Sequence, residues 1–377
     1  MILSNQYNAI KNSLNTSDNG INFFRSSIMF FCFLLALTLS GLLLLLTDGD
    51  PFEVFASLIR GSFGSKASLV MTLNHTGPVL LVATGAVIAG RANLLNIGQE
   101  GQIAIGGIFA VVVGLYLPGP RWVVLPLVLL ASSFGGAGWA GIAATMKFKR
   151  GVNEVISTLL LIVVAFQVLS FSVNRPWLLR ESQRLDSYGA PLPRTNSIND
   201  EAIMPLLAQG SGFRLHAGIL VAIFSAVIIS LILSRTRWGF YLRMTGLNQI
   251  AAKAQGVSTA LTGATALIFS GALAGLCGGV VLTGTSFRVS DGFTGGYGWT
   301  GLLAAFVANL NPVMLIPCSI LFGALRAGGG VLASTGVSQN IVGVIQGFIV
   351  LSVVIPTVMF KTHDRKKSSV SLKEERI

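Results

Sequence analysis

Long apolar segments alternate with short polar ones along most of this chain of 377 residues. A helix that crosses a bilayer needs roughly 20 apolar residues, and "SIMFFCFLLALTLSGLLLLLT" (27–47) meets that requirement. Further spans are predicted near 70–90, 103–117, 122–146, 154–173 and 215–234. The pattern therefore predicts an all-α fold, a polytopic bundle of transmembrane helices.

The last part of the chain has three long stretches without Asp, Glu, Lys or Arg. Each is too long for one span, and whether it forms two spans is ambiguous. Pro312 in "NLNP" resists helix continuation and places a turn inside the second stretch. The resulting spans lie near 260–283, 298–309, 312–330 and 340–360, which gives about ten in total and a range of eight to ten. The segment at 298–309 is too short to cross alone, so a re-entrant or tilted piece is expected there.

The stretch "SFRVSDGFTGGYGWTG" (286–301) differs from the spans around it because Gly, Ser and Asp are dense in it. This composition predicts a broken helix with re-entrant backbone. Irregular backbone at membrane depth occurs only where it is buried in protein or lines a wet cavity.

Basic residues orient the predicted bundle. They gather in "KFKRG" (147–151), in the loop around 235–259 and in the tail 361–377. Because basic loops face the cytoplasm, both termini, including segment 1–26, are predicted inside. The loops 48–69 and 174–213 are then outside, and 27–360 forms the transmembrane domain, in the cell's inner (plasma) membrane.

Composition excludes several classes of protein. Only 11% of residues are charged, whereas soluble domains have about a quarter. The net charge of +12 lies in loops with few interleaved aromatic residues, so nucleic acid is not indicated. The stretch "GSFGSKAS" (61–68) lacks the Gly before Lys that a phosphate loop needs. With no catalytic constellation, metal spacing or cysteine pairing evident, we expect neither an enzyme nor a bound cofactor.

A polar cluster stands out in "RANLLNIGQEGQIAIGG" (91–107), between two strongly apolar flanks. If this stretch is helical, Asn96 and Glu100 are four residues apart and Gln99 and Gln102 three apart, which makes two neighbouring polar rows. Carboxamides donate and accept hydrogen bonds, so the cluster suits a neutral polyhydroxyl or heterocyclic solute. The alternative is a helix-to-helix network that locks the bundle, and the sequence leaves both interpretations open.

A second informative stretch is "GLNQIAAKAQG" (246–256), where two glycines bracket about nine helix-forming residues in a basic cytoplasmic loop. A short amphipathic helix of this kind can fill a groove on a soluble partner. The alternative is an ordinary solvated loop helix.

Together these stretches resemble the permease subunits of ATP-binding-cassette (ABC) importers for simple sugars and nucleosides. The resemblance covers about residues 65–360 and also includes "GVNEVISTLLL" (151–161), "GGYGWTGLLAAF" (295–306) and "NPVMLIPCSILFGALRAGG" (311–329). It implies a coupling helix that docks on the ATPase, with Gly246, Asn248, Ala251, Ala252 and Gly256 in its motif. The string around Asn96 is more similar to the nucleoside branch than to the ribose type. The turn "NLNP" departs from the family's Arg-Asn-Asn-Pro pattern.

The resemblance also implies partners: two ATPase subunits, a second permease subunit that is identical or paralogous, an extracytoplasmic solute-binding protein or lipoprotein, and a small-molecule solute. The competing class is a stand-alone secondary transporter or channel. Such a protein normally needs an ion site, and Glu100, Glu154 and Asp291 are the carboxylates near spans.

The predicted orientation has a direct test. A cysteine at Ser197 should react with an impermeant thiol reagent added outside intact cells, and one at Ser368 should react only after the membrane is permeabilised. The reverse labelling pattern would overturn the orientation derived from the basic loops.

Overall fold

A computed structural model describes residues 31–32, 34–42, 44–45, 50–182, 192–210, 212–334, 341–356 and 359. The predicted tail 361–377 and the N-terminal segment 1–26 lie outside these residues. The chain divides into two compact units, one formed by residues 57–332 and the other by described parts of 1–56 and 333–377.

Seven helices of the described chain are long and apolar enough to cross a membrane. In chain order the α-helices are α2 (Pro51–Phe63), α3 (Lys66–Arg91), α4 (Gln99–Tyr116), α5 (Arg121–Arg150), α6 (Glu154–Asn174), α7 (Gly218–Arg235), α8 (Arg237–Leu247), α9 (Gln249–Ala254), α10 (Thr259–Val281), α11 (Tyr297–Val307) and α12 (Leu315–Ser334). The apolar helices Tyr297–Val307 and Ile341–Pro356 are shorter. The predicted polytopic helical membrane protein is confirmed at this level.

Helix α2 and the start of α3 occupy residues 51–63 and 66–69, within the stretch 48–69 that the sequence suggested was a loop. The Asp50 carboxylate accepts a hydrogen bond from the Phe52 amide at 2.9 Å, which satisfies one free donor at the helix start. Pro51 occupies the first helical position, where its missing N–H costs nothing. The predicted loop was wrong because residues such as Asp50 and Pro51, which are common in loops, also begin helices.

Three helices form the interior of the 57–332 unit. The most apolar windows of α3, α4 and α10 are 78%, 67% and 72% buried, whereas those of α5, α6 and α7 are 28–33% buried. Helix α10 packs against α3, α4 and α5. The outer faces of α5, α6 and α7 are consequently the surfaces available to lipid or to other subunits.

Glycines let the interior helices approach one another closely. A Cβ at Gly136 of α5 would lie 2.3 Å from the Gly271 carbonyl oxygen of α10, and a Cβ at Gly106 of α4 would lie 2.6 Å from Gly275 Cα. Lipid gives apolar helices no hydrophobic reason to associate, so this close backbone contact supplies the dispersion energy that holds them together.

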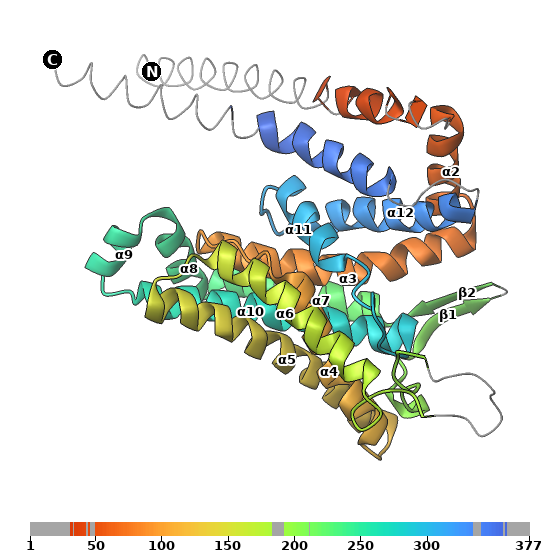
Figure 1. Cartoon of the computed structure of the whole chain (residues 1–377). Coiled ribbons are helices and arrows are strands. Elements are labelled where there is room, and N and C mark those ends of the chain that lie inside the picture. Colours follow the sequence, from red (N-terminus) through yellow and green to blue (C-terminus); the bar gives the residue numbers. More distant parts are fainter. Residues whose placement is uncertain are drawn as a thin grey trace, which may run out of the picture. The chain divides into compact units, whose positions relative to one another are not determined.

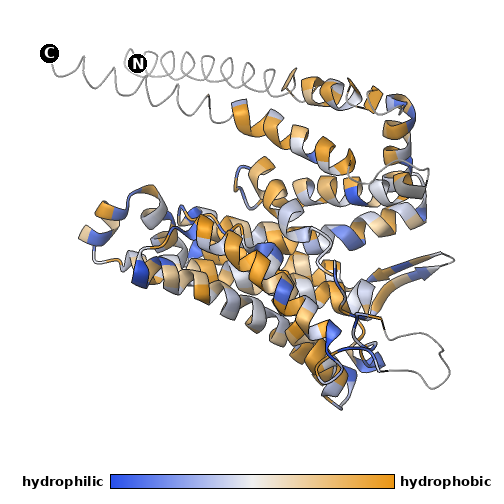
Figure 2. Cartoon of the chain, viewed as in Figure 1, coloured by the Kyte–Doolittle hydropathy of each residue, from blue (hydrophilic) through white to orange (hydrophobic). Residues whose placement is uncertain are grey.

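Connecting segments lie at the two ends of this unit (Figure 1), and polar residues are frequent in them (Figure 2). One end carries α8, α9 and the α5–α6 turn, where Lys147 and Glu154 form an ion pair of 2.5 Å. The other end carries a 3₁₀ turn (Asp200–Ala202) and a hairpin of β1 (Leu206–Gly210) and β2 (Phe213–His216), a small exception to an all-α fold. Figure 2 shows apolar helix surfaces between these polar ends.

In the other unit, the described residues among 31–45 are helical, and a second helix runs through Ile341–Pro356. The first of these overlaps the predicted span 27–47. The remaining residues of that predicted span lie outside the residues that the structure describes.

A glycine pair on α5 tests the packing argument. Gly136→Ala should lower the free energy of unfolding by about 1–3 kcal/mol, because its methyl group would overlap α10 backbone. Gly138→Ala is the matched control, since a Cβ there meets nothing within 4 Å. Thermal melting of the purified protein compares the two, and equal melting temperatures would contradict close α5–α10 packing.

Candidate functional site

The polar cluster lies where α4 begins. Helix α3 ends at Arg91, Asn93 takes a left-handed backbone conformation (φ 56°), and Gly98 precedes the first helical residue Gln99. Asn96 therefore lies in a non-helical connection. The predicted pair of helical rows is wrong for Asn96, although Gln99, Glu100 and Gln102 do lie on the first turn of α4.

All four predicted side chains are buried, with exposed fractions of 0–2%. Asn96 Nδ2 donates to Gln102 Oε1 and to Ser270 Oγ, both at 2.9 Å, and Gln102 Nε2 donates back to Asn96 Oδ1 at 3.1 Å. These bonds join the α3–α4 connection, α4 and α10. In this conformation Asn96 and Gln102 are occupied by protein partners, so their contact with solute stays a prediction.

Gln99 is less completely bonded. Its Nε2 donates to the Val82 carbonyl oxygen of α3 at 2.9 Å. Its Oε1 is buried without a hydrogen-bond partner among the described residues. Gln99 is therefore the member of the cluster whose side-chain oxygen can still accept a hydrogen bond.

Glu100 binds the N-terminus of α11. Its Oε1 accepts from the Gly296 amide at 2.9 Å and its Oε2 from the Gly298 amide at 2.5 Å. The first N–H groups of a helix have no intrahelical partner and carry a partial positive charge. A buried carboxylate that accepts two of them is stabilised without a cationic side chain. Arg91, the nearest basic residue in the sequence, donates to the Leu310 carbonyl oxygen instead.

Two side chains from other helices, Arg326 and His75, also hold this turn. Arg326 of α12 donates to the Gly295 carbonyl oxygen at 2.7 Å and to Thr300 Oγ1 at 3.2 Å. Its guanidinium lies 4.1 Å from the centre of the Tyr297 ring. The Tyr297 hydroxyl lies 2.6 Å from His75 Nδ1 of α3. The start of α11 is thus bonded to α3, α4 and α12.

The backbone that leads into α11 is irregular, as the composition of 286–301 predicted. Helix α10 continues into a π-helical turn at Leu282–Ser286, and Phe287 then has a φ of 55°. Gly292, Gly295 and Gly296 have φ values of 79°, 55° and 78°, a region that favours glycine. At about 1.5 Å per residue, the 11-residue helix α11 is too short to cross a bilayer.

The predicted external loop runs alongside this irregular segment. Backbone amides of Thr195, Ile198 and Met204 donate to the carbonyl oxygens of Val289, Phe287 and Thr283, respectively, at 2.9–3.0 Å. Glu181 accepts from Arg194 at 2.8 Å and from Arg288 at 2.5 Å, and these guanidiniums hold the pKa of its carboxyl below the usual value. We call residues 192–204 the outer strap.

His216 closes the base of the hairpin beside α7. Its Nδ1 accepts from the Gly218 amide at 3.1 Å, and its Nε2 has no hydrogen-bond partner among the described residues. Burial lowers the pKa of His216 to about 4, so the ring is neutral at pH 7.

The predicted coupling segment forms two helices instead of one. Asn248 separates α8 from α9 and caps α9 by accepting from the Ile250 and Ala251 amides, both at 3.0 Å. Gly256 follows α9 with a φ of 78°, which fits its place after the helix. Gly246 belongs to α8, where a Cβ would lie 2.2 Å from the Arg91 carbonyl oxygen.

The surface of this segment is partly apolar. Leu247 and Ile250 are 88% and 81% exposed, whereas Ala252 is fully buried. Ala251 is exposed on the same short helix. Two protruding aliphatic side chains next to basic residues form a surface suited to a soluble partner's groove.

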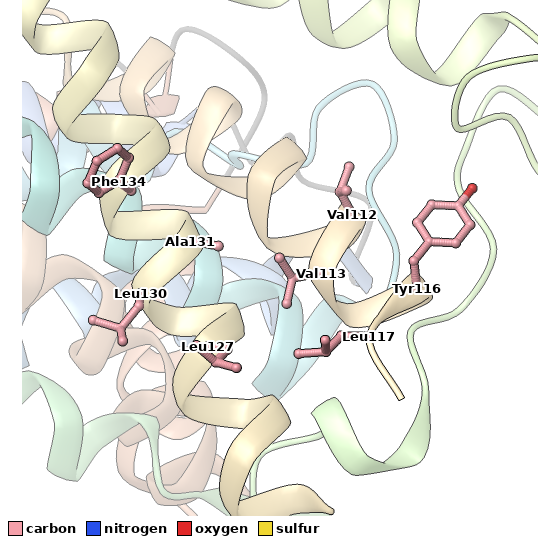
Figure 3. Close-up of a pocket in the computed structure, with 8 residues that line it drawn as sticks. All are labelled: Val112, Val113, Tyr116, Leu117, Leu127, Leu130, Ala131 and Phe134. Atoms are coloured by element: carbon pink, nitrogen blue, oxygen red, sulfur yellow. The ribbon is translucent and has the colours of Figure 1, made fainter. Parts of the chain in front are cut away.

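Two cavities differ in chemistry. Figure 3 shows the larger, of about 570 Å³, between α4 and α5; its lining is aliphatic and aromatic and includes Phe134 and Tyr116, so it suits apolar groups. The smaller, of about 200 Å³, lies where α3, α6 and α11 end or begin, and it is lined by Asn93, Asn96 and Glu154 together with Phe306.

The carboxylates proposed for an ion site do not converge. Glu100 is bound to backbone amides, Glu154 pairs with Lys147, and Asp291 is exposed. Among the described residues no group of three or more His, Cys, Asp or Glu side chains could hold a metal ion. This arrangement does not favour a stand-alone ion-coupled transporter.

Sequence reasoning missed His75, Tyr297 and Arg326 as partners of the irregular segment. One signal was present for Arg326, because it is the lone charge between two long uncharged stretches. The pairing of Glu100 with α11 had no local signal, since it joins residues almost 200 positions apart through backbone amides.

The Asn96 network can be tested by a mutant cycle. Asn96→Ala should lower the free energy of unfolding by about 1–3 kcal/mol, because Gln102 and Ser270 lose a buried partner. Removing Gln102 as well, with Gln102→Leu, should add less than its separate cost, since the unpaired amide disappears. Thermal or denaturant unfolding measures the cycle, and strictly additive losses would contradict the network.

Comparisons with known proteins agree with this architecture. Residues 68–354 match the family model described as the permease component of branched-chain amino acid transport systems. The chain is 30% identical to a glucose ABC transporter permease of Haloferax volcanii, covering 84% of each chain. It is also 30% identical to a guanosine ABC transporter permease of Bacillus subtilis, covering 85% of this chain and 90% of the relative.

A nucleoside ABC transporter permease of Lactococcus lactis is 28% identical over 89% of this chain and 94% of its own. A second guanosine ABC transporter permease of Bacillus subtilis is 25% identical to this chain, and the match covers 67% of this chain and 78% of the relative. With a family match over most of its length, this chain belongs to the ABC transporter permeases described as the permease component of branched-chain amino acid transport systems.

Proposed function

We propose that this chain is the membrane-spanning subunit of an ABC importer that carries a nucleoside or a simple sugar. The observation that carries the proposal is the family match over residues 68–354, which extends across the spans from α3 onward. Permeases of this family have no ATPase domain of their own, so the chain forms the path and another subunit supplies the energy. The solute class follows from relatives whose names specify guanosine, nucleosides and glucose.

The ATPase docks on α9 and the end of α8 in this proposal. Leu247 and Ile250 protrude from a segment that carries basic but no acidic residues. Exposed aliphatic side chains are unfavourable in water, and covering them with an apolar groove lowers the free energy of the complex. Because Gly246 touches the end of α3, movement of this segment would be passed directly into the bundle.

The remaining partners are a second permease and an extracytoplasmic solute-binding protein or lipoprotein. Two different guanosine permeases occur in Bacillus subtilis, and this chain is more similar to one than to the other. We therefore favour a paralogous second permease over an identical one. The binding protein would meet the end that carries the outer strap and the hairpin.

The polar cluster can contact solute only in a conformation that exchanges its internal hydrogen bonds for bonds to solute. Gln99 is the best placed, since its Oε1 has no partner to give up among the described residues. The proposed path therefore passes Gln99, with Asn96, Glu100 and Gln102 behind it.

A reconstituted transporter tests the function. The chain is purified with a candidate ATPase, a candidate second permease and a candidate solute-binding protein from the same organism. The assembly is placed in liposomes and assayed for uptake of labelled guanosine and labelled glucose. ATP-dependent uptake of one of them is expected. Uptake driven by an ion gradient without ATP would instead support the secondary-transporter class.

The docking proposal predicts a specific loss. Ile250→Asp and Leu247→Asp should each reduce recovery of the ATPase with the tagged permease by at least about tenfold, the effect of losing a buried anchor of roughly 1.4 kcal/mol or more. These positions are better probes than Ala252, whose burial means that a glutamate there would disturb the helix itself.

Leu207→Asp is the matched control, since Leu207 is an exposed leucine at the opposite end of the bundle. It should leave ATPase recovery unchanged. Wild-type recovery with Ile250→Asp, or an equal loss with Leu207→Asp, would refute docking at this segment.

A further inference from the structure

We infer that residues 287–296 move to open and close the solute path at its outer end, which we call the outer gate. Glu100 and Arg326 form a latch that holds these residues in the closed position. The inference rests on the proposed transport function. It assigns Glu100 and Arg326 as positioning residues that act through the backbone of this segment, which we call the gate segment.

Two side chains of opposite charge bind the gate segment where it leads into α11. Glu100 accepts from the Gly296 and Gly298 amides, and Arg326 donates to the Gly295 carbonyl oxygen. Charge-assisted hydrogen bonds are roughly twice as strong as neutral ones. Both charges are directed at main-chain atoms within four residues, so they fix the position of the backbone itself.

Glu100 fits closely against this backbone. A Cβ at Gly298 would lie 2.5 Å from both the Glu100 amide nitrogen and its Oε2, so α11 can begin here only with glycine at this position. Each of the two carboxylate oxygens already accepts a hydrogen bond from a backbone amide, that of Gly296 or that of Gly298. This degree of occupation leaves the carboxylate little capacity for solute while the latch is closed.

Phe293 anchors the middle of the gate segment by packing against α4. Its side chain is 7% exposed, and a Cβ at Gly107 of α4 would lie 2.4 Å from its ring. The absence of a side chain at Gly107 therefore makes the recess into which Phe293 fits. This contact lies on the same helix as Glu100, two turns further along.

The outer end of the gate segment is fastened to the outer strap. Val289 exchanges hydrogen bonds with Thr195, whose amide donates to its carbonyl oxygen at 2.9 Å and whose Oγ1 accepts from its amide at 3.1 Å. Arg288 pairs with Glu181 at 2.5 Å. A binding protein that displaces the strap would pull on the gate segment through these bonds.

The backbone on each side of the gate segment allows such movement. A π-helical turn precedes it at Leu282–Ser286, and glycines with positive φ occupy 292, 295 and 296. π-helical turns occur frequently at functional sites. The segment is thus attached at both ends by discrete polar bonds and contains hinge-like backbone, the features of an element with two arrangements.

A buried cysteine reports whether the gate is open. Val289 is fully buried, so Val289→Cys should react slowly with an impermeant maleimide, in a protein whose native cysteines at 32, 277 and 318 are replaced by alanine. The experiment uses the assembled transporter in liposomes, and the exposed position Ser197→Cys calibrates the reagent.

Glu100→Gln should raise the labelling rate at position 289 by about tenfold, equivalent to about 1.4 kcal/mol. A glutamine can accept from only one of the two amides and presents its NH₂ group to the other. Gly107→Ala, two turns further along the same helix, should have the same effect by displacing Phe293. ATP hydrolysis without solute should rise with both variants as the gate opens independently of the binding protein.

Two controls separate a latch from a stabilising contact. Asn96→Ala breaks the adjacent buried network and should lower the melting temperature without faster labelling at 289. Gly138→Ala adds a methyl group in open space and should change neither measurement.

Unchanged labelling with Glu100→Gln, whether or not the melting temperature falls, would overturn the latch. So would an altered preference between guanosine and glucose at wild-type labelling, which would place Glu100 in contact with solute. Wild-type uptake is measured in the same liposomes, and its absence would count against the proposed function while leaving the labelling comparison readable.

Discussion

The bond between the Glu100 carboxylate and the first amides of α11 is the interaction on which this architecture depends. A helix that begins inside the bundle exposes N–H groups that neither lipid nor a preceding turn can satisfy. Glu100 supplies acceptors for two of them, and the helix terminus in turn stabilises a charge that would be costly in hydrocarbon. The broken helix and the buried carboxylate therefore each lower the free-energy cost of the other.

Close helix packing brings these two groups together. Helix α4 lies against α10 and α5 with glycine at the contacts, so its first turn reaches the interior where α11 starts. The Asn96–Gln102–Ser270 bonds then fix the connection that leads into α4. Small residues determine how near the helices come, and polar residues determine their register.

Much of this could be predicted from the sequence because the governing signals are local. Apolar length predicted most spans, the Gly-rich stretch 286–301 predicted a break, and Pro312 predicted the turn after α11. The helical rows assigned to Asn96 failed because Gly98 begins the helix later than the polar pattern suggests. The bonds of Glu100 and Arg326 to distant main-chain atoms were out of reach, since backbone amides leave no trace in the pattern of side chains.

An ABC permease that works through this break should open it during transport, and hydrogen exchange at residues 294–300 measures that directly. In the assembled transporter without ATP, the amides bound by Glu100 should exchange slowly. Adding ATP and the solute-loaded binding protein should accelerate exchange there while the central part of α10 stays protected. Exchange at 294–300 that is unaffected by these additions, or that rises equally along α10, would contradict the account.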